Sequence, residues 1–151
     1  MKYLPIGLDL RNRKCVVVGG GRIGTRKVLN LIQAGASVTL VSPEISKEMA
    51  PMAEAAELEW IQEEYRPEHL HGVFLAVAAT DDEGLNAHLV RDARVRGVLV
   101  CDASSAERSQ VIFGALHAED DVTVAVFTDG KDPSRARKAR DRIARLLSED
   151  R

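Results

Sequence analysis

The sequence has few residues of the kinds that build metal centres or disulfides. It has two cysteines, Cys15 and Cys101, and each lies in or beside an apolar run that predicts a buried strand. We therefore expect two small buried hydrophobic side chains rather than a disulfide, and no cluster with metal-ligand spacing. The four histidines have no clear ligand or base partner, so we expect them at surface or hairpin positions: His69, His71, His88 and His117.

Other absences exclude whole classes of protein. No apolar run approaches the roughly 20 residues that span a bilayer. Residues 1–10 lack the basic start and long apolar core of a signal peptide. The net charge of −2 gives no overall basic character, which argues against a nucleic-acid partner. We therefore expect a cytoplasmic protein with no membrane segment. Its 151 residues, 45% of them apolar, suffice for one domain with a small appendage.

The most informative segment is residues 15–24, in which a short apolar run meets a glycine cluster and a helical pattern follows. Gly19 permits a tight turn, Gly21 lets a pyrophosphate approach the backbone, and Gly24 lets the helix pack against the strand. The start of the helix offers unpaired N–H groups and the positive end of its dipole to phosphates. This strand–turn–helix context predicts a dinucleotide-binding loop rather than a purely structural turn.

Apolar runs alternate with helical patterns over the first hundred residues. A continuous apolar run is typical of a strand that is covered on both faces. This βαβαβ alternation predicts the α/β class, with a Rossmann-type parallel sheet and helices on both faces. The predicted strands are 14–18, 37–41, 58–61, 73–78 and 98–101, and the predicted helices are 21–34, 43–56 and 81–96 or 82–96.

The pattern changes after Ala103. We expect a polar loop, a strand–hairpin–helix segment with its turn at Asp120–Asp121, and a final helix over 134–147 that carries many arginines. These elements are too small to bury a core alone, so we interpret them as a dimerisation arm and predict a homodimer. The predicted division is a dinucleotide-binding domain over 1–113 and a dimerisation segment over 114–151. The basic helix is either a solvated face or a surface that recognises a polyanionic substrate.

Ligands of Rossmann folds bind at the carboxyl ends of the strands. At the end of the second predicted strand, Glu44 lies slightly later than the acidic residue that usually holds a ribose, although the Ser42 hydroxyl or a backbone group can take that role. No basic residue over 42–44 can receive a 2′-phosphate, which favours NAD over NADP. At the end of the fourth strand, Thr80 and Asp81 are candidates for ribose contacts.

Two further residues follow the fourth strand, and one closes the fifth. Asp82 is more simply a helix cap, and Asn86 could point at the same cleft. Asp102 closes the fifth strand, where a carboxylate faces the nicotinamide end of the crevice. It can act as a general base or hold a cationic substrate group. The alternative is an aspartate that starts a turn with Ser104 and Ser105, and chemistry alone does not choose between these roles.

Three motifs together resemble the N-terminal module of siroheme synthase, from about Tyr3 to the C-terminus. The first comprises Leu4-Pro5, Leu8-Asp9-Leu10, Val17–Gly21 and Arg26-Lys27-Val28. The second comprises Ala78–Asp82 with Leu85-Asn86. The third resembles an (S/T)-G-G-x-S-P segment that opens the dimerisation helix, with Thr128, Gly130, Pro133, Ala136 and Arg140.

The resemblance implies a precorrin-2 dehydrogenase, in which NAD⁺ takes a hydride from precorrin-2 to give sirohydrochlorin, and sometimes a ferrochelatase as well. It implies that Asp102 matches the aspartate implicated in the chemistry. A non-catalytic, dimeric NAD-binding module is the alternative. With the residue-based arguments above, the candidate cofactor contacts are Gly19, Gly20, Gly21, Arg22, Ile23, Gly24, Ser42, Pro43, Glu44, Thr80 and Asp81, with no metal site.

The chain departs from the family pattern near the expected substrate site. Leu99–Asp102 replaces Asn-Val-Val-Asp, residues 112–115 with Gly114 replace Phe-x-x-Pro, and Asp129 and Asp132 replace a glycine and a serine. Many members continue beyond the position of Arg151 into a helical domain that helps to cover the tetrapyrrole. The cofactor motif is therefore intact, and the departures concentrate on the substrate side.

Overall fold

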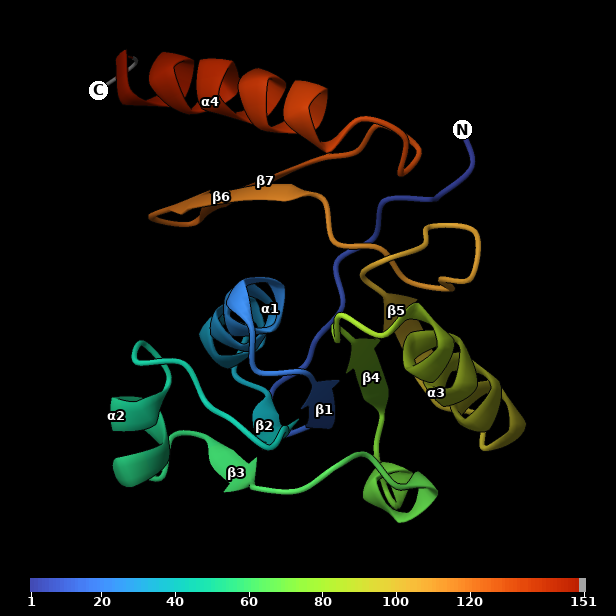
Figure 1. The fold of residues 1–151 in the computed structure, drawn as a ribbon. Helices are drawn as coiled ribbons and strands as arrows, with labels where there is room; N and C mark the ends of the chain where they lie inside the picture. Colours follow the sequence, from blue (N-terminus) through green and yellow to red (C-terminus); the bar gives the residue numbers. More distant parts are fainter. Residues whose placement is uncertain (150–151) are drawn as a thin grey trace. The chain divides into compact units, whose positions relative to one another are not determined.

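The five apolar runs form one parallel sheet (Figure 1). The structure is a computed structural model that describes residues 1–149. The strand order is β3-β2-β1-β4-β5, which confirms the predicted Rossmann-type fold. The strands are β1 (Lys14–Val18), β2 (Ser37–Val41), β3 (Glu59–Ile61), β4 (Leu75–Ala78) and β5 (Leu99–Asp102).

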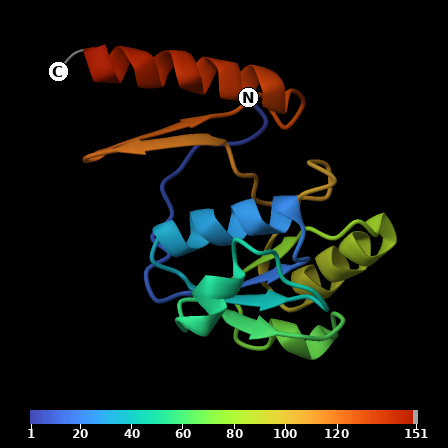
Figure 2. The same ribbon diagram turned by 60° about the vertical axis from the view of Figure 1, so that its left-hand side comes forward.

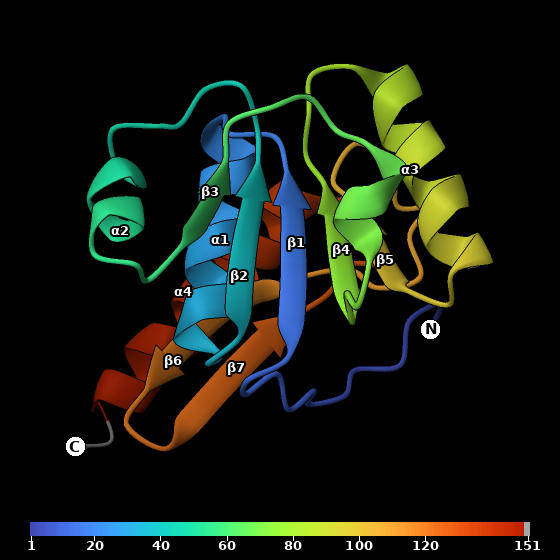
Figure 3. The same ribbon diagram turned by 90° about the horizontal axis from the view of Figure 1, so that it is seen from below.

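Helices cover both faces of this sheet. Figures 1 and 3 show α1 (Arg22–Gln33) on one face and α3 (Glu83–Val95) on the other. Successive residues of a strand point to opposite faces, so a strand covered on both faces is apolar at consecutive positions, as β4 is throughout and β1 is from Cys15 to Val18. In β1, Val16 and Val18 belong to the core that Leu89 and Val90 of α3 complete. Cys15 and Val17 point to the other face, and both are fully buried.

The ends of α1 and α3 carry the predicted signals. Gly35 follows α1 with a φ of +79°, a left-handed conformation that ends a helix at little cost for glycine. The Asp82 side chain caps α3 by accepting a hydrogen bond from the Leu85 N–H at 3.0 Å. The predicted capping role of Asp82 is therefore confirmed.

The helix predicted over 43–56 is wrong over most of its length, because α2 covers only Ala50–Glu54. The Ser46 side chain and carbonyl both accept from the Met49 N–H, at 3.2 and 3.1 Å, which holds the preceding residues in turns. The buried Met49 side chain anchors the end of this segment. Residues 42–49 therefore form a loop at the carboxyl end of β2, and Pro51 occupies the first turn of the short helix.

The chain separates into two compact units, one of which is Leu8–Val111. The other combines Met1–Gly7 with the residues from Ile112 onward. The sequence did not indicate that the first seven residues belong to the second unit. Their assignment reflects contacts between distant residues, such as the hydrogen bond that the Lys2 N–H donates to Asp129 Oδ1, 127 positions away, at 3.2 Å. The predicted boundary between residues 113 and 114 stays a prediction.

The second unit is a hairpin with one helix packed on it (Figure 2). Strands β6 (Ala115–Glu119) and β7 (Val122–Val126) pair antiparallel around the predicted Asp120–Asp121 turn. Helix α4 (Pro133–Glu149) packs on both strands. Residues 150–151 of the predicted dimerisation segment lie outside the described residues. Among residues 1–149, no helix has both the length and the apolar character needed to cross a bilayer.

Candidate functional site

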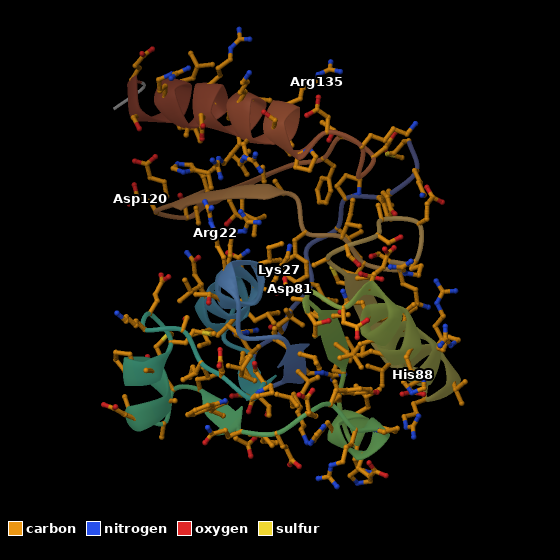
Figure 4. The ribbon with its side chains drawn as sticks, viewed as in Figure 1. Arg22, Lys27, Asp81, His88, Asp120 and Arg135 are labelled. Carbon is orange, nitrogen blue, oxygen red and sulfur yellow. The ribbon has the colours of Figure 1, made fainter. Side chains whose placement is uncertain are left out.

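The first unit has a cleft of about 650 Å³ at the carboxyl edge of its sheet. It lies where the chain leaves β1 and β4, the point at which the strand order reverses and Rossmann folds bind their ligands. Figure 4 labels Asp81 at the end of β4, on this edge. The predicted site residues that line the cleft are Gly19, Gly20, Gly21, Ser42, Pro43, Glu44, Thr80 and Asp81.

The glycines of the loop differ in what surrounds them. A Cβ at Gly24 would overlap the carbonyl of Gly19, so Gly24 allows α1 to approach the turn closely. Cβ atoms at Gly19 and Gly20 would likewise overlap backbone carbonyls, those of Ala79 and Glu44. A Cβ at Gly21 would meet nothing within 4 Å. Gly21 therefore borders open space, where a ligand can approach the backbone.

The start of α1 is suited to an anion. Gly21 is its N-cap residue and supplies no side-chain cap, and the first turn contains no acidic residue. The first N–H groups of a helix have no partner within it and carry the positive end of the dipole. Arg22, Ile23 and Gly24 form the first turn of α1, and they are not among the residues that line the cleft. Their role as cofactor contacts stays a prediction. This uncapped start and the open space at Gly21 fit a pyrophosphate group.

The loop after β2 forms the neighbouring wall. The Ser42 carbonyl accepts a hydrogen bond from Trp60 Nε1 at 2.9 Å, and the Pro43 carbonyl accepts from Gln62 Nε2 at 3.3 Å. The Thr25 hydroxyl lies 3.0 Å from the Ser46 hydroxyl, which ties the loop to α1. These bonds fix the loop at the place where Ser42 and Glu44 line the cleft.

Charge in the cleft has one sign. Among the described residues that line it, five are acidic and none is basic; the acidic ones are Glu44, Glu63, Glu64, Asp81 and Asp82. A 2′-phosphate would meet repulsion here, whereas a ribose hydroxyl can donate to a carboxylate. These acids form no metal centre, since residues 1–149 contain no group of three or more His, Cys, Asp or Glu side chains that could hold an ion.

Sequence reasoning missed the wall that follows β3, formed by Glu63, Glu64 and Tyr65. His69, expected at the surface, has a side chain that is only 6% exposed, and its Nε2 lies 3.3 Å from Glu63 Oε1. His69 and then Arg66 lower the pKa of Glu63. Burial and a 2.8 Å hydrogen bond to Asp92 raise the pKa of Tyr65. The only local signal was the position of these residues after a short strand.

Asp102 lies at the end of β5 but does not line the cleft. Its side chain is fully buried and is held by two partners. Oδ1 accepts from the Ser104 N–H at 2.9 Å and from its hydroxyl at 2.6 Å, and Oδ2 accepts from Arg108 Nε at 2.6 Å. The hydrogen bond to Asp102 raises the pKa of Arg108, which also pairs with Glu83. The turn with Ser104 is therefore present, and the carboxylate is ion-paired as well.

Comparison with known proteins indicates the class of cofactor that the cleft binds. A family model described as putative NAD(P)-binding matches residues 6–115 of this chain. The chain belongs to this NAD(P)-binding family. The membership confirms the predicted nicotinamide dinucleotide, NAD, as the class of cofactor, and the matched residues include the glycine loop and the whole sheet.

The chain is also similar to longer proteins. It is 42% identical over 147 residues to a siroheme synthase from Chromobacterium violaceum and 40% identical over 147 residues to one from Photorhabdus laumondii. Each alignment covers 97% of this chain but 31% of the relative, so the chain spans about a third of their length. Among solved structures it resembles SirC, a precorrin-2 dehydrogenase, with a TM-score of 0.82 and 28% identity over 95% of this chain and 71% of SirC.

Proposed function

We propose that this chain catalyses the NAD-dependent dehydrogenation of precorrin-2 to sirohydrochlorin in sirohaem biosynthesis. The observation that carries the proposal is the similarity to SirC, which covers 95% of the chain. The first unit, Leu8–Val111, is shorter than that, so the similarity extends into the hairpin and helix of the second unit. A generic dinucleotide-binding domain would match the first unit alone.

The cleft of the first unit supplies the cofactor site of this proposal. When bound, NAD⁺ supplies the acceptor for a hydride. The start of α1 and the open space at Gly21 bind the pyrophosphate, and Ser42, Glu44, Thr80 and Asp81 offer partners to the ribose hydroxyls. The acidic lining makes NAD the preferred cofactor over NADP.

Asp102 is the proposed catalytic residue. Dehydrogenation removes a hydride and a proton from the tetrapyrrole, and a carboxylate can accept the proton. The Asp102 carboxylate is oriented by Ser104 and paired with Arg108, whose guanidinium also lies 3.2 Å from Glu83 Oε1. Arg108 therefore has a second anionic partner that can balance its charge when Asp102 takes up the proton.

A second candidate function is a dimeric module that binds NAD and does not catalyse a reaction. One observation favours it: Asp102 is buried, engaged by Ser104 and Arg108, and absent from the residues that line the cleft. A carboxylate with these contacts can serve the turn alone. The two candidates differ in whether NAD⁺ is reduced, so one assay separates them.

The test is an anaerobic incubation of the protein with NAD⁺ and precorrin-2, in which sirohydrochlorin absorbance and NADH are followed together. Equal amounts of both products, formed only when the protein is present, are the expected result. Tight NAD⁺ binding without product would favour the non-catalytic module. Ferrous iron added after the reaction tests ferrochelatase activity, since sirohaem formation above the rate without protein would add that function.

The same proposal includes a homodimer in the cytoplasm. The hairpin and α4 form a small unit with exposed apolar side chains, among them Leu116, Val122, Ile143 and Leu146. Elements of this size bury little surface by themselves, and a second copy of the chain can cover these side chains.

A further inference from the structure

Asn86 is a buried polar residue that the proposed mechanism leaves without a role. It lies one turn into α3 and is 1% exposed. Its Oδ1 accepts from the Thr80 N–H at 3.1 Å and from the Thr80 hydroxyl at 2.7 Å. Its Nδ2 donates to the Thr80 carbonyl at 3.0 Å and to the Ser104 hydroxyl at 3.2 Å. An asparagine amide has two acceptor sites and two donor hydrogens, so all four are used.

These bonds hold Thr80 from three sides. Asn86 contacts its N–H, its carbonyl and its hydroxyl, and Thr80 is one of the residues that line the cleft. The segment after β4 is a loop, which by itself could take several backbone conformations. The position of this part of the cleft wall is therefore set by a side chain of α3.

The fourth bond of Asn86 continues toward the proposed catalytic carboxylate. The Ser104 hydroxyl accepts from Asn86 and has one hydrogen, which it donates to Asp102 Oδ1 at 2.6 Å. In this series of hydrogen bonds each donor is on the side away from Asp102, because a carboxylate only accepts hydrogen bonds. The amide of Asn86 cannot be turned over without placing its NH₂ group against the Thr80 N–H, so the direction of the chain is determined.

We propose that Asn86 is a positioning residue that holds the Thr80 wall of the cofactor cleft and, through Ser104, orients the Asp102 carboxylate. The inference rests on the proposed function. It assigns two separable effects to one side chain: the bonds to Thr80 serve cofactor affinity, and the bond to Ser104 serves turnover.

The binding test uses Asn86→Asp, which keeps the shape and the acceptor but loses both donors and faces the Thr80 carbonyl with a carboxylate oxygen. Calorimetry with NAD⁺ should show affinity at least about tenfold weaker. The reason is that a buried polar group left without its hydrogen-bond partner costs free energy. Asn30→Asp, the same change on α1 outside the cleft lining, is the matched control and should bind NAD⁺ as the wild type does. A folded Asn86→Asp protein with wild-type affinity would overturn the proposal.

If Asn86→Asp does not fold, Asn86→Ser is the second variant. Its short neutral side chain removes the hydrogen bonds of the amide to Thr80, and the same loss of affinity is expected. The wild type offers a check that needs no variant. The side-chain amide protons of Asn86 should shift in NMR spectra as NAD⁺ is added, and shifts that stay unchanged at saturation would contradict the proposal. Absence of NAD⁺ binding by the wild type would instead refute the proposed function.

The turnover test uses Ser104→Ala, which leaves the Thr80 contacts of Asn86 in place. Ser104 is exposed, so the fold should tolerate the change. We expect kcat to fall about tenfold, because a hydrogen bond to a charged group is lost, with NAD⁺ affinity and KM for NAD⁺ unchanged. A parallel loss of affinity and kcat in Ser104→Ala would refute the separation of the two effects.

Discussion

Replacing Gly21 with valine should remove NAD⁺ binding and leave the fold intact. Gly21 has a φ of −78° and a ψ of −168°, an extended conformation that valine adopts readily. A Cβ there would meet no protein atom within 4 Å. The valine side chain would therefore extend into the open space beside the first N–H groups of α1, where we place the pyrophosphate.

The expected effect on stability is small. Exchanging glycine for valine at an N-cap costs up to about 1 kcal/mol. The less flexible unfolded chain returns about 0.4–1 kcal/mol. These opposing contributions nearly cancel, so the melting temperature should move by no more than a few degrees.

The expected effect on binding is much larger. A hydrogen bond to a charged group contributes about 1.5–3 kcal/mol. If valine keeps the phosphates from two N–H groups, about 3–6 kcal/mol is lost, which weakens NAD⁺ binding by about 100-fold or more. Binding is measured by calorimetry and folding by circular dichroism and thermal melting.

Two other glycines serve as controls for this experiment. A Cβ at Gly7 also meets nothing within 4 Å, so Gly7→Val should fold and bind NAD⁺ normally. A Cβ at Gly24 would overlap the Gly19 carbonyl, so Gly24→Val should fail to fold. A folded Gly21→Val protein with unchanged NAD⁺ affinity would show that the loop does not hold the pyrophosphate.

Three further outcomes are expected. NADP⁺ should bind more weakly than NAD⁺ because the cleft lining is acidic; equal or tighter NADP⁺ binding would contradict the assignment. Light scattering should give a dimer, and truncation before Leu116 a monomer or an insoluble first unit, whereas a full-length monomer at micromolar concentration would refute the dimerisation arm. Asp102→Asn should keep NAD⁺ affinity and lose about 10²–10⁴-fold in turnover, as for a general base. It should melt at a lower temperature because an amide NH₂ would face Arg108, and normal turnover well below that temperature would assign Asp102 to the turn alone.

Much of the first unit could be predicted because its signals are local. In β1, the residues from Cys15 to Val18 are apolar at each position, and the glycines that follow β1 are the residues that a close turn and an open phosphate site require. The Asp82 cap and the Gly35 stop are also local, since each concerns backbone groups within a few residues. The cofactor class follows from these patterns and from the order of the elements.

The errors arise where a local pattern competes with more distant contacts. The pattern over 43–56 predicts a helix, but residues 42–49 form a loop. The Ser46 hydroxyl accepts a hydrogen bond from the Met49 N–H, and Gln62, which follows β3, donates one to the Pro43 carbonyl. Residues 63–65 carry no motif, and they reach the cleft because β3 pairs beside β2 at the same edge of the sheet.

The sequence by itself therefore determined the strands, the glycine loop and the kind of ligand, because each depends on neighbours in the chain. Only the tertiary structure decided the partners of the polar groups. Asn86 meets Ser104, 18 positions away, and Arg108 meets both Asp102 and Glu83. Such contacts depend on how α3 packs beside β4 and β5. Periodic patterns in the sequence indicate the type of each element but not which side chains of different elements meet. For this reason Asn86 and Ser104, which lie far apart in the sequence, come to link Thr80 of the cofactor cleft to the buried carboxylate.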